Sequence, residues 1–91
     1  MKFYYVYVLL SEKDGQFYTG YTDDLRARFK QHNQGKVKST RKRRPFQLIY
    51  YEACLNQKDA LRREKYLKTT YGKRYLKNRL KDYLLENNST G

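Results

Sequence analysis

Apolar residues recur along this chain at two different spacings, and each spacing predicts a kind of element. The chain opens with an apolar run at residues 3–10, FYYVYVLL. Aromatic and β-branched side chains suit a pleated surface that is buried on at least one side. A turn signal follows at residues 13–15, KDG, because an Asp-Gly pair can supply positive φ. Residues 16–21 then have the pattern of a returning strand. We therefore predict that the chain opens with an antiparallel β-hairpin.

The next segment has the spacing of an amphipathic helix. We predict this helix over about residues 23–33, with Thr22 as its N-cap and Gly35 as its stop. Acidic residues in its first turn suit the helix dipole. Arg28 and His32 fall on the same stripe as its apolar residues. The helix therefore directs an arginine and a histidine toward the core side.

Residues 34–44 interrupt the apolar pattern. They read QGKVKSTRKRR, and a glycine, small polar residues and closely spaced cations are typical of a flexible basic loop rather than a packed element. Pro45 ends this loop. Residues 46–51, FQLIYY, then predict a third strand, continuing to Ala53 or Cys54, that joins the sheet of the hairpin.

Two more helical segments complete the chain. Asn56 is the predicted N-cap of the first and Gly72 its stop, and the second runs over about residues 73–85. We predict one domain over residues 1–85 and a flexible tail at 86–91. The element order is ββαβαα. The predicted fold class is therefore α+β, a small three-stranded antiparallel sheet flanked by three helices.

The charge of the chain indicates a polyanionic partner. It has 21 Lys and Arg against 9 Asp and Glu, a net charge of +12 over 91 residues. No fold requires this imbalance, whereas nucleic acid attracts it. Anionic membranes and acidic proteins would be attracted too, and the loop cations could instead only solubilise their segment. The phosphate contacts that we predict are the cations of the basic loop: Lys36, Lys38, Arg41, Lys42, Arg43 and Arg44.

The apolar run and the cysteine content indicate in which cellular compartment the protein is expected. Residues 3–10 are too few to span a bilayer, so we expect no membrane partner. Cys54 is the single cysteine and cannot form an intrachain disulfide. The chain therefore fits a reducing compartment, and we expect a cytoplasmic protein. We interpret Cys54 as a small buried residue rather than a nucleophile.

Several polar residues fall where a core would prefer apolar ones. Tyr7 lies in the first strand and Tyr18 in its partner, Arg28 and His32 share one helix stripe, and Glu64 lies on the inner stripe of the next helix. These five side chains can converge on one face of the sheet. Each also has an ordinary interpretation: tyrosines pack in sheets, the Arg and His form a solvated face, and the carboxylate joins a structural ion pair.

The order and spacing of these residues match a known family. The matching segments are VYV at 6–8, YTG at 18–20, LRARF at 25–29, His32, and ALRREKYLK at 60–68. In them the chain resembles the GIY-YIG endonuclease domain over roughly residues 3–70, most closely the short stand-alone bacterial members. The first segment lacks the glycine and isoleucine of the family name.

This resemblance implies hydrolysis of phosphodiester bonds in nucleic acid, with DNA favoured over RNA. By position, Tyr7 and Tyr18 would be the two strand tyrosines, with Tyr7 as general base. Arg28 would stabilise charge on the phosphate, and His32 falls where relatives have His or Tyr. Glu64 would hold one divalent metal ion, Mg²⁺ or Mn²⁺. Because tyrosine titrates near pH 10, we expect neighbouring cations to lower the pKa of the base.

Two other functions remain open from the sequence. A non-catalytic nucleic-acid-binding module would bind with strong salt dependence and without regard to metal. A protein-interaction or structural module would bind nucleic acid only nonspecifically. Cleavage that requires both the metal and Glu64 separates the endonuclease from both.

Overall fold

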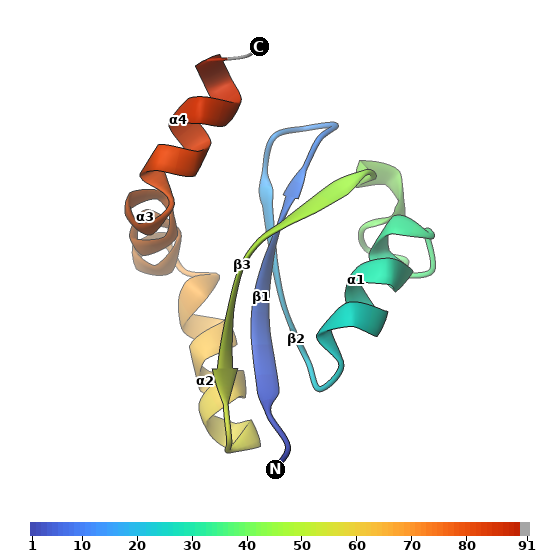
Figure 1. Ribbon diagram of the computed structural model, residues 1–91, viewed down its shortest axis with the longest axis vertical. Helices are drawn as coiled ribbons and strands as arrows, with labels where there is room; N and C mark the ends of the chain where they lie inside the picture. Colours follow the sequence, from blue (N-terminus) through green and yellow to red (C-terminus); the bar gives the residue numbers. More distant parts are fainter. Residues whose placement is uncertain (90–91) are drawn as a thin grey trace.

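The computed structural model describes residues 1–89, and its centre is a three-stranded antiparallel sheet (Figure 1). The strands are β1 (Tyr4–Ser11), β2 (Phe17–Thr22) and β3 (Phe46–Cys54), in the order β2-β1-β3. β1 pairs with both neighbours, so the first strand of the chain is the central one. The predicted hairpin and third strand are confirmed, and so is the α+β class.

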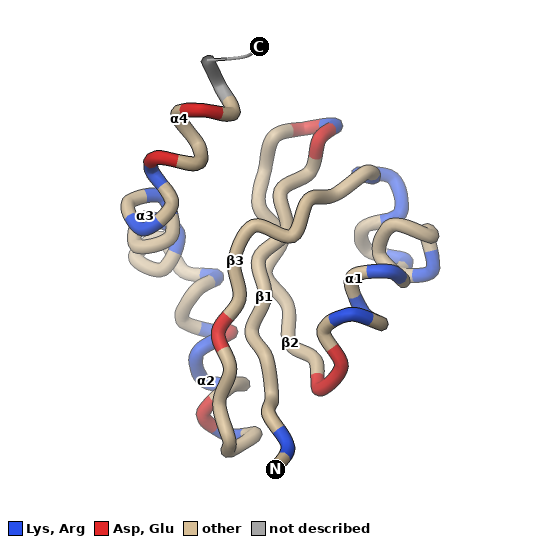
Figure 2. The backbone as a smooth tube through the Cα atoms, viewed as in Figure 1, with Lys and Arg blue, Asp and Glu red and all other residues tan. Residues whose placement is uncertain are grey.

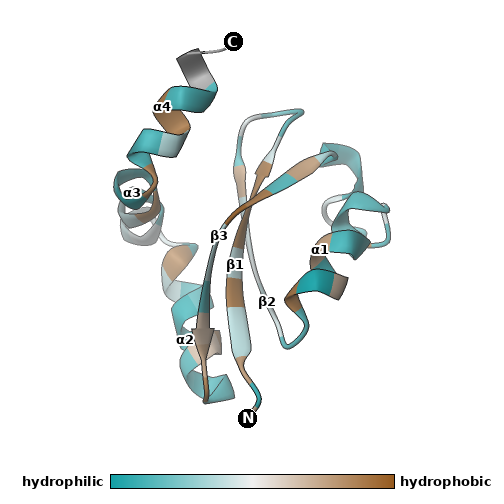
Figure 3. Ribbon diagram, viewed as in Figure 1, coloured by the Kyte–Doolittle hydropathy of each residue, from teal (hydrophilic) through white to brown (hydrophobic). Residues whose placement is uncertain are grey.

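The side chains of β1 supply the core on both faces of the sheet. Successive side chains of a strand point to opposite faces. Val6 and Val8 therefore pack toward one helical layer, and Tyr7 and Leu9 pack toward the other. All four are almost fully buried. Figure 3 shows the hydrophobic residues of β1 at the centre and mainly hydrophilic residues on the helices around it. The central strand thus places Tyr7 inside the molecule.

Helices cover the two faces of the sheet unequally. One face carries α1 (Leu25–Asn33), and the other carries α2 (Gln57–Leu67), α3 (Thr70–Arg79) and α4 (Lys81–Ser89) (Figure 1). None of the helices in residues 1–89 is long and apolar enough to cross a membrane. The sheet therefore lies between a single helix and a group of three.

The start of α1 differs from the prediction by two residues. The N-cap is Asp24, whose carboxylate accepts a hydrogen bond from the Ala27 amide at 3.1 Å. Thr22, the predicted cap, instead accepts from the Asp24 amide at 3.1 Å. The Asp24 carboxylate, and not the Thr22 hydroxyl, accepts from an amide of the first turn, which is the role of an N-cap.

The end of α1 is fixed to β3 by Asn33. Its side-chain amide donates to the Phe46 carbonyl at 3.0 Å and accepts from the Phe46 amide at 2.8 Å. These two bonds satisfy both backbone groups at the start of β3. They also hold the last turn of α1, which carries His32, against the sheet.

Three helices were predicted, and residues 1–89 form four α-helices. α2 ends at Leu67 rather than near Gly72, because Thr69 caps a new helix that contains Gly72. A side chain at Gly72 would overlap the backbone of Tyr66 and Leu67, so this glycine permits a close approach of two helices instead of stopping one.

The helix predicted over residues 73–85 is in fact divided. The backbone leaves helical geometry at Leu80, and α3 and α4 lie on either side of it. The predicted tail at 86–91 overlaps α4, which continues to Ser89. Residues 90–91 lie outside the described part of the chain.

The segment that follows α1 is packed, so the prediction of a flexible, unpacked basic loop is wrong. It contains a short 3₁₀ helix, η1 (Arg41–Arg43). Val37 and Thr40 are buried beside it. Two inward residues among the cations are therefore enough to bind the segment to the domain.

Candidate active site

Three buried side chains joined by hydrogen bonds form the centre of the site: Tyr7, His32 and Thr40. The Tyr7 hydroxyl lies 2.8 Å from Nε2 of His32, and Nδ1 of His32 lies 2.8 Å from Oγ1 of Thr40. Tyr7 is 1% exposed, and the other two residues are completely buried. Both ring nitrogens of His32 are therefore engaged within the protein.

Gly20 makes room for the Tyr7 side chain. It lies opposite Tyr7 in the pairing of β1 with β2, and a Cβ at this position would overlap the Tyr7 ring and hydroxyl. The ring can therefore lie flat across β2, the edge strand. This position brings the hydroxyl to the same side as α1.

Aromatic rings enclose the imidazole. The ring centres of Tyr18 and Tyr7 lie 5.1 and 5.6 Å from that of His32, and that of Phe46 lies 6.0 Å away. Such contacts exclude water and hold the ring in one orientation. Tyr18 thus belongs to the same cluster as Tyr7, as predicted from their adjacent strands.

Arg28 lies one turn before His32 on α1. Its Nη1 donates to Oε1 of Gln31 at 3.2 Å, and the side chain is half-buried. The guanidinium is near enough to Tyr7 to lower the pKa of its phenol through a hydrogen bond and through its charge. The same helix therefore directs a cation and the histidine toward Tyr7.

The pKa of Tyr7 moves in the direction opposite to the prediction. Burial raises it to about 12, and Arg28 opposes this rise without cancelling it. Burial, and next the charge of Arg28, lower the pKa of His32 to about 4. Desolvation disfavours the charged form of each group. At neutral pH the site therefore holds a protonated tyrosine beside a neutral imidazole.

Glu64 approaches from the other helical layer. It lies on α2, and its carboxylate pairs with the Lys68 ammonium at 3.1 Å. Its charge is close enough to raise the pKa of Tyr7. The predicted convergence on one sheet face is therefore wrong in this respect, because four of the five residues come from the α1 side and Glu64 from α2.

Two helices border an open hollow next to this cluster. It has a volume of about 580 Å³ and is lined by Arg28 and Gln31 of α1 and by Gln57 of α2. Gln57 also donates to the Tyr21 hydroxyl at 2.9 Å. The hollow gives Arg28 access to a ligand from solvent.

A family model for the GIY-YIG catalytic domain matches residues 3–80 of the chain. The chain belongs to the GIY-YIG family. The match extends beyond the predicted residues 3–70 into α3 and includes all five residues that we assigned to the site. The GIY-YIG superfamily is generally one of endonucleases, so this domain is of the nuclease type.

The similar proteins belong to one group of small proteins, the UPF0213 proteins. The GIY-YIG domain is 48% identical over 68 residues to a UPF0213 protein from Lacticaseibacillus paracasei, covering 74% of this chain and 75% of that protein. It is 47% identical over 81 residues to one from Pediococcus acidilactici, covering 82% of each. The solution NMR structure of a UPF0213 protein from Bacillus halodurans has a TM-score of 0.52 and 40% identity, with 81% of both chains covered. The chain therefore belongs to the small stand-alone GIY-YIG proteins.

This GIY-YIG domain has one acidic residue at the predicted metal position. Within residues 1–89, His, Cys, Asp and Glu side chains form no group of three that could hold a metal ion. Mg²⁺ is commonly bound by one or two carboxylates and takes its other ligands from water and phosphate. Glu64, with a side chain that is 20% exposed, fits an ion that the substrate helps to bind.

The cations predicted to contact phosphate divide into two groups. Arg43 is half-buried and pairs with Asp14 at 2.7 Å, so its role is to hold the segment in place. Figure 2 shows Lys and Arg along α1 and the segment after it, and again on α2 and α3. The exposed members of the predicted set are Lys36, Lys38, Arg41, Lys42 and Arg44.

Sequence reasoning did not identify Thr40 as part of the site. The residue lies among small polar residues and cations, a composition that indicates a solvated loop. Only its spatial position beside His32 distinguishes it from Ser39. No spacing rule links the two positions, because the chain leaves the helix between them.

Proposed function

We propose that this GIY-YIG protein is a metal-dependent endonuclease that hydrolyses phosphodiester bonds in nucleic acid, with DNA favoured over RNA. One observation carries the proposal. The Tyr7 hydroxyl is hydrogen-bonded to a neutral, buried His32, and the charges of Arg28 and Glu64 are close enough to shift its pKa. In this proposal the base, the acceptor for its proton and the cation for the phosphate come from the α1 side of the sheet, and the metal ligand comes from α2, close enough for its charge to act on Tyr7.

Arg28 binds and stabilises the phosphate in this mechanism. Its guanidinium borders the open hollow, where a phosphate oxygen can reach it. Charge accumulates on these oxygens in the transition state, and a fixed cation in a partly buried site stabilises that charge. Glu64 would hold one Mg²⁺ or Mn²⁺. The bound ion would act as a Lewis acid on the phosphate.

Tyr7 removes the proton of the attacking water in this proposal. The phenol is protonated at neutral pH, so it accepts this proton as its own proton moves along the 2.8 Å bond to Nε2 of His32. The resulting hydroxide forms a bond to phosphorus, and the bond from phosphorus to the leaving ester oxygen breaks. The leaving oxygen takes a proton from solvent, and His32 later returns its proton to solvent. No free tyrosinate is needed.

The test is cleavage of labelled single-stranded, duplex, flap and branched DNA and RNA, with Mg²⁺, Mn²⁺ or a chelator. We compare the wild type with Arg28→Ala and Glu64→Gln. Arg26→Ala and Asp59→Asn are the matched controls, since each removes an exposed charge from the same helix. We expect metal-dependent products that fall by on the order of 10²-fold in the two site variants and persist in the controls.

The exposed cations after α1 favour a second function, nucleic-acid binding without cleavage, because binding by these cations would not require Tyr7 or Glu64. A non-catalytic nucleic-acid-binding module would use these cations alone. In that case no substrate of the panel is cut, and binding is unchanged in Arg28→Ala and Glu64→Gln. That result overturns the endonuclease assignment.

A further inference from the structure

Thr40 connects the basic segment to the buried histidine. It is completely buried, although Arg41, Lys38 and Ser39 around it are exposed. Its hydroxyl lies 2.8 Å from Nδ1 of His32. A hydroxyl can donate to an imidazole nitrogen or accept from it, so the other hydrogen bond of Thr40 decides which role it takes toward Nδ1.

The proton can be placed from the hydrogen-bond partners. A guanidinium only donates, so the nearby Arg28 cannot accept the Tyr7 proton. Among the residues that the structure describes, Nε2 of His32 is the acceptor found for the Tyr7 hydroxyl. Nε2 therefore carries the lone pair, and Nδ1 carries the proton and donates it to Thr40. The Thr40 hydroxyl donates its own proton to the Val37 carbonyl at 3.4 Å, so its oxygen accepts from Nδ1. This bond places the proton on Nδ1 independently of Tyr7.

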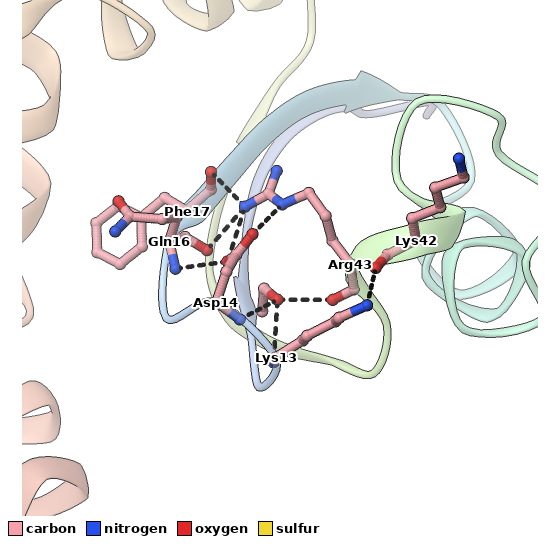
Figure 4. Close-up of polar contacts among 7 residues, drawn as sticks. Lys13, Asp14, Gln16, Phe17, Lys42 and Arg43 are labelled. Atoms are coloured by element: carbon pink, nitrogen blue, oxygen red, sulfur yellow. Dashed lines mark hydrogen bonds and ion pairs between the residues drawn. The ribbon is translucent and has the colours of Figure 1, made fainter.

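Contacts with the β1–β2 hairpin hold the segment that carries Thr40 (Figure 4). Arg43 pairs with Asp14 at 2.7 Å and also donates to the carbonyls of Gln16 and Phe17. The Lys13 ammonium donates to the Lys42 carbonyl at 3.0 Å. These bonds join two segments that are far apart in the sequence. They fix the chain at Lys42 and Arg43, two and three residues after Thr40.

We propose that Thr40 is a positioning residue that holds the neutral His32 with its proton on Nδ1 and its Nε2 lone pair directed at Tyr7. The role resembles that of the orienting carboxylate in a catalytic triad, with a hydroxyl in its place. Its effect on cleavage rests on the proposed nuclease function. The ring tautomer itself is a property of the folded protein and can be measured without any substrate.

The single histidine of the chain makes this measurement direct. In ¹⁵N-labelled protein at neutral pH, the ring nitrogens of His32 give the only histidine side-chain signals. We expect the wild type to show a protonated Nδ1 and an unprotonated Nε2. A wild-type spectrum with the proton on Nε2 overturns the proposal, and this result requires no variant.

Variants test which neighbour fixes the tautomer. Thr40→Val keeps the shape and removes the acceptor, and we expect at least a tenfold shift of the tautomer ratio toward a protonated Nε2. Thr40→Ser and Tyr7→Phe retain the Thr40-position hydroxyl and should keep the wild-type tautomer. An unchanged tautomer in Thr40→Val, or a changed one in Tyr7→Phe, overturns the proposal.

The kinetic arm separates this role from that of a packing residue. We expect Thr40→Val to lower kcat by at least about tenfold with KM within twofold of the wild type, and Thr40→Ser to restore kcat. Equal loss in both variants would indicate packing and would overturn the positioning role. If no substrate is cut by the wild type, the nuclease proposal fails, whereas the ¹⁵N spectra still decide the tautomer.

Discussion

Burial controls the charge of the two central residues, Tyr7 and His32, more than their neighbours do. The sequence predicted that five side chains converge, and the structure brings four of them together on one side of the sheet: Tyr7, Tyr18, Arg28 and His32. The direction that the sequence predicted for the pKa shift of Tyr7 is wrong. The number of nearby cations can be counted in a sequence, whereas the loss of solvent around a phenol depends on how three elements pack.

The lowered pKa of His32 predicts a pH dependence of stability. The unfolded chain binds a proton at His32 near pH 6.5, and the folded protein does so only near pH 4. Acid therefore favours the unfolded state across this range. We expect the free energy of unfolding to fall by about 2 kcal/mol between pH 7 and pH 5, measured by urea denaturation. His32→Gln should show little of this dependence. An equal slope in both proteins would contradict the assignment.

Gly20→Ala tests the space that Tyr7 occupies. The added methyl group overlaps the Tyr7 ring, so either strand or ring must move. We expect a loss of roughly 1–3 kcal/mol of unfolding free energy and a loss of the Tyr7–His32 hydrogen bond. Urea denaturation and the His32 ¹⁵N spectrum measure the two effects. Gly15→Ala is the control, because it adds backbone strain at φ 71° in an open turn and should leave the spectrum unchanged.

Strands were predicted more accurately than helix ends in this chain. The strands have continuous runs of aromatic and β-branched residues, bounded by Asp14-Gly15 and Pro45. The helix ends depend on packing: Gly72 has the composition of a stop and serves instead as a contact between α2 and α3. The break at Leu80 contains neither glycine nor proline, so the local sequence does not signal it.

The segment that carries η1 is predicted to depend on Arg43 for its order. We expect Arg43→Ala to remove the bonds to Asp14 and the hairpin carbonyls and to speed amide hydrogen exchange across residues 37–44. The unfolding free energy should fall by only about 1 kcal/mol, since the pair is partly exposed. Arg41→Ala is the matched control and should leave the exchange unchanged. Unchanged exchange in both variants would show that other contacts hold the segment.

On the scale of the whole molecule, the exposed cations after α1 and the buried Tyr7 cluster lie on the same side of the sheet but differ in their exposure to solvent. The composition alone shows the net charge of +12, and this charge favours a polyanionic partner. The separation of exposed cations from the buried Tyr7 cluster required the structure. Under the proposed function, binding and cleavage can therefore be altered independently. Within the basic segment, Thr40 contacts the buried His32, and Arg43 holds the segment to the hairpin.

This separation predicts opposite results for two kinds of variant. Replacing Arg41 or Lys42 with Ala removes an exposed charge and should weaken binding to all sequences alike. The slope of log K against log salt should fall by about 0.9 for each lost contact with duplex DNA. Glu64→Gln should leave this slope unchanged while metal-dependent cleavage falls by on the order of 10²-fold. Fluorescence anisotropy over a salt series, in the presence of a chelator, measures binding without cleavage. A slope that changes in Glu64→Gln as much as in Arg41→Ala would mean that Glu64 acts through binding, and would remove the physical basis for assigning it to the metal.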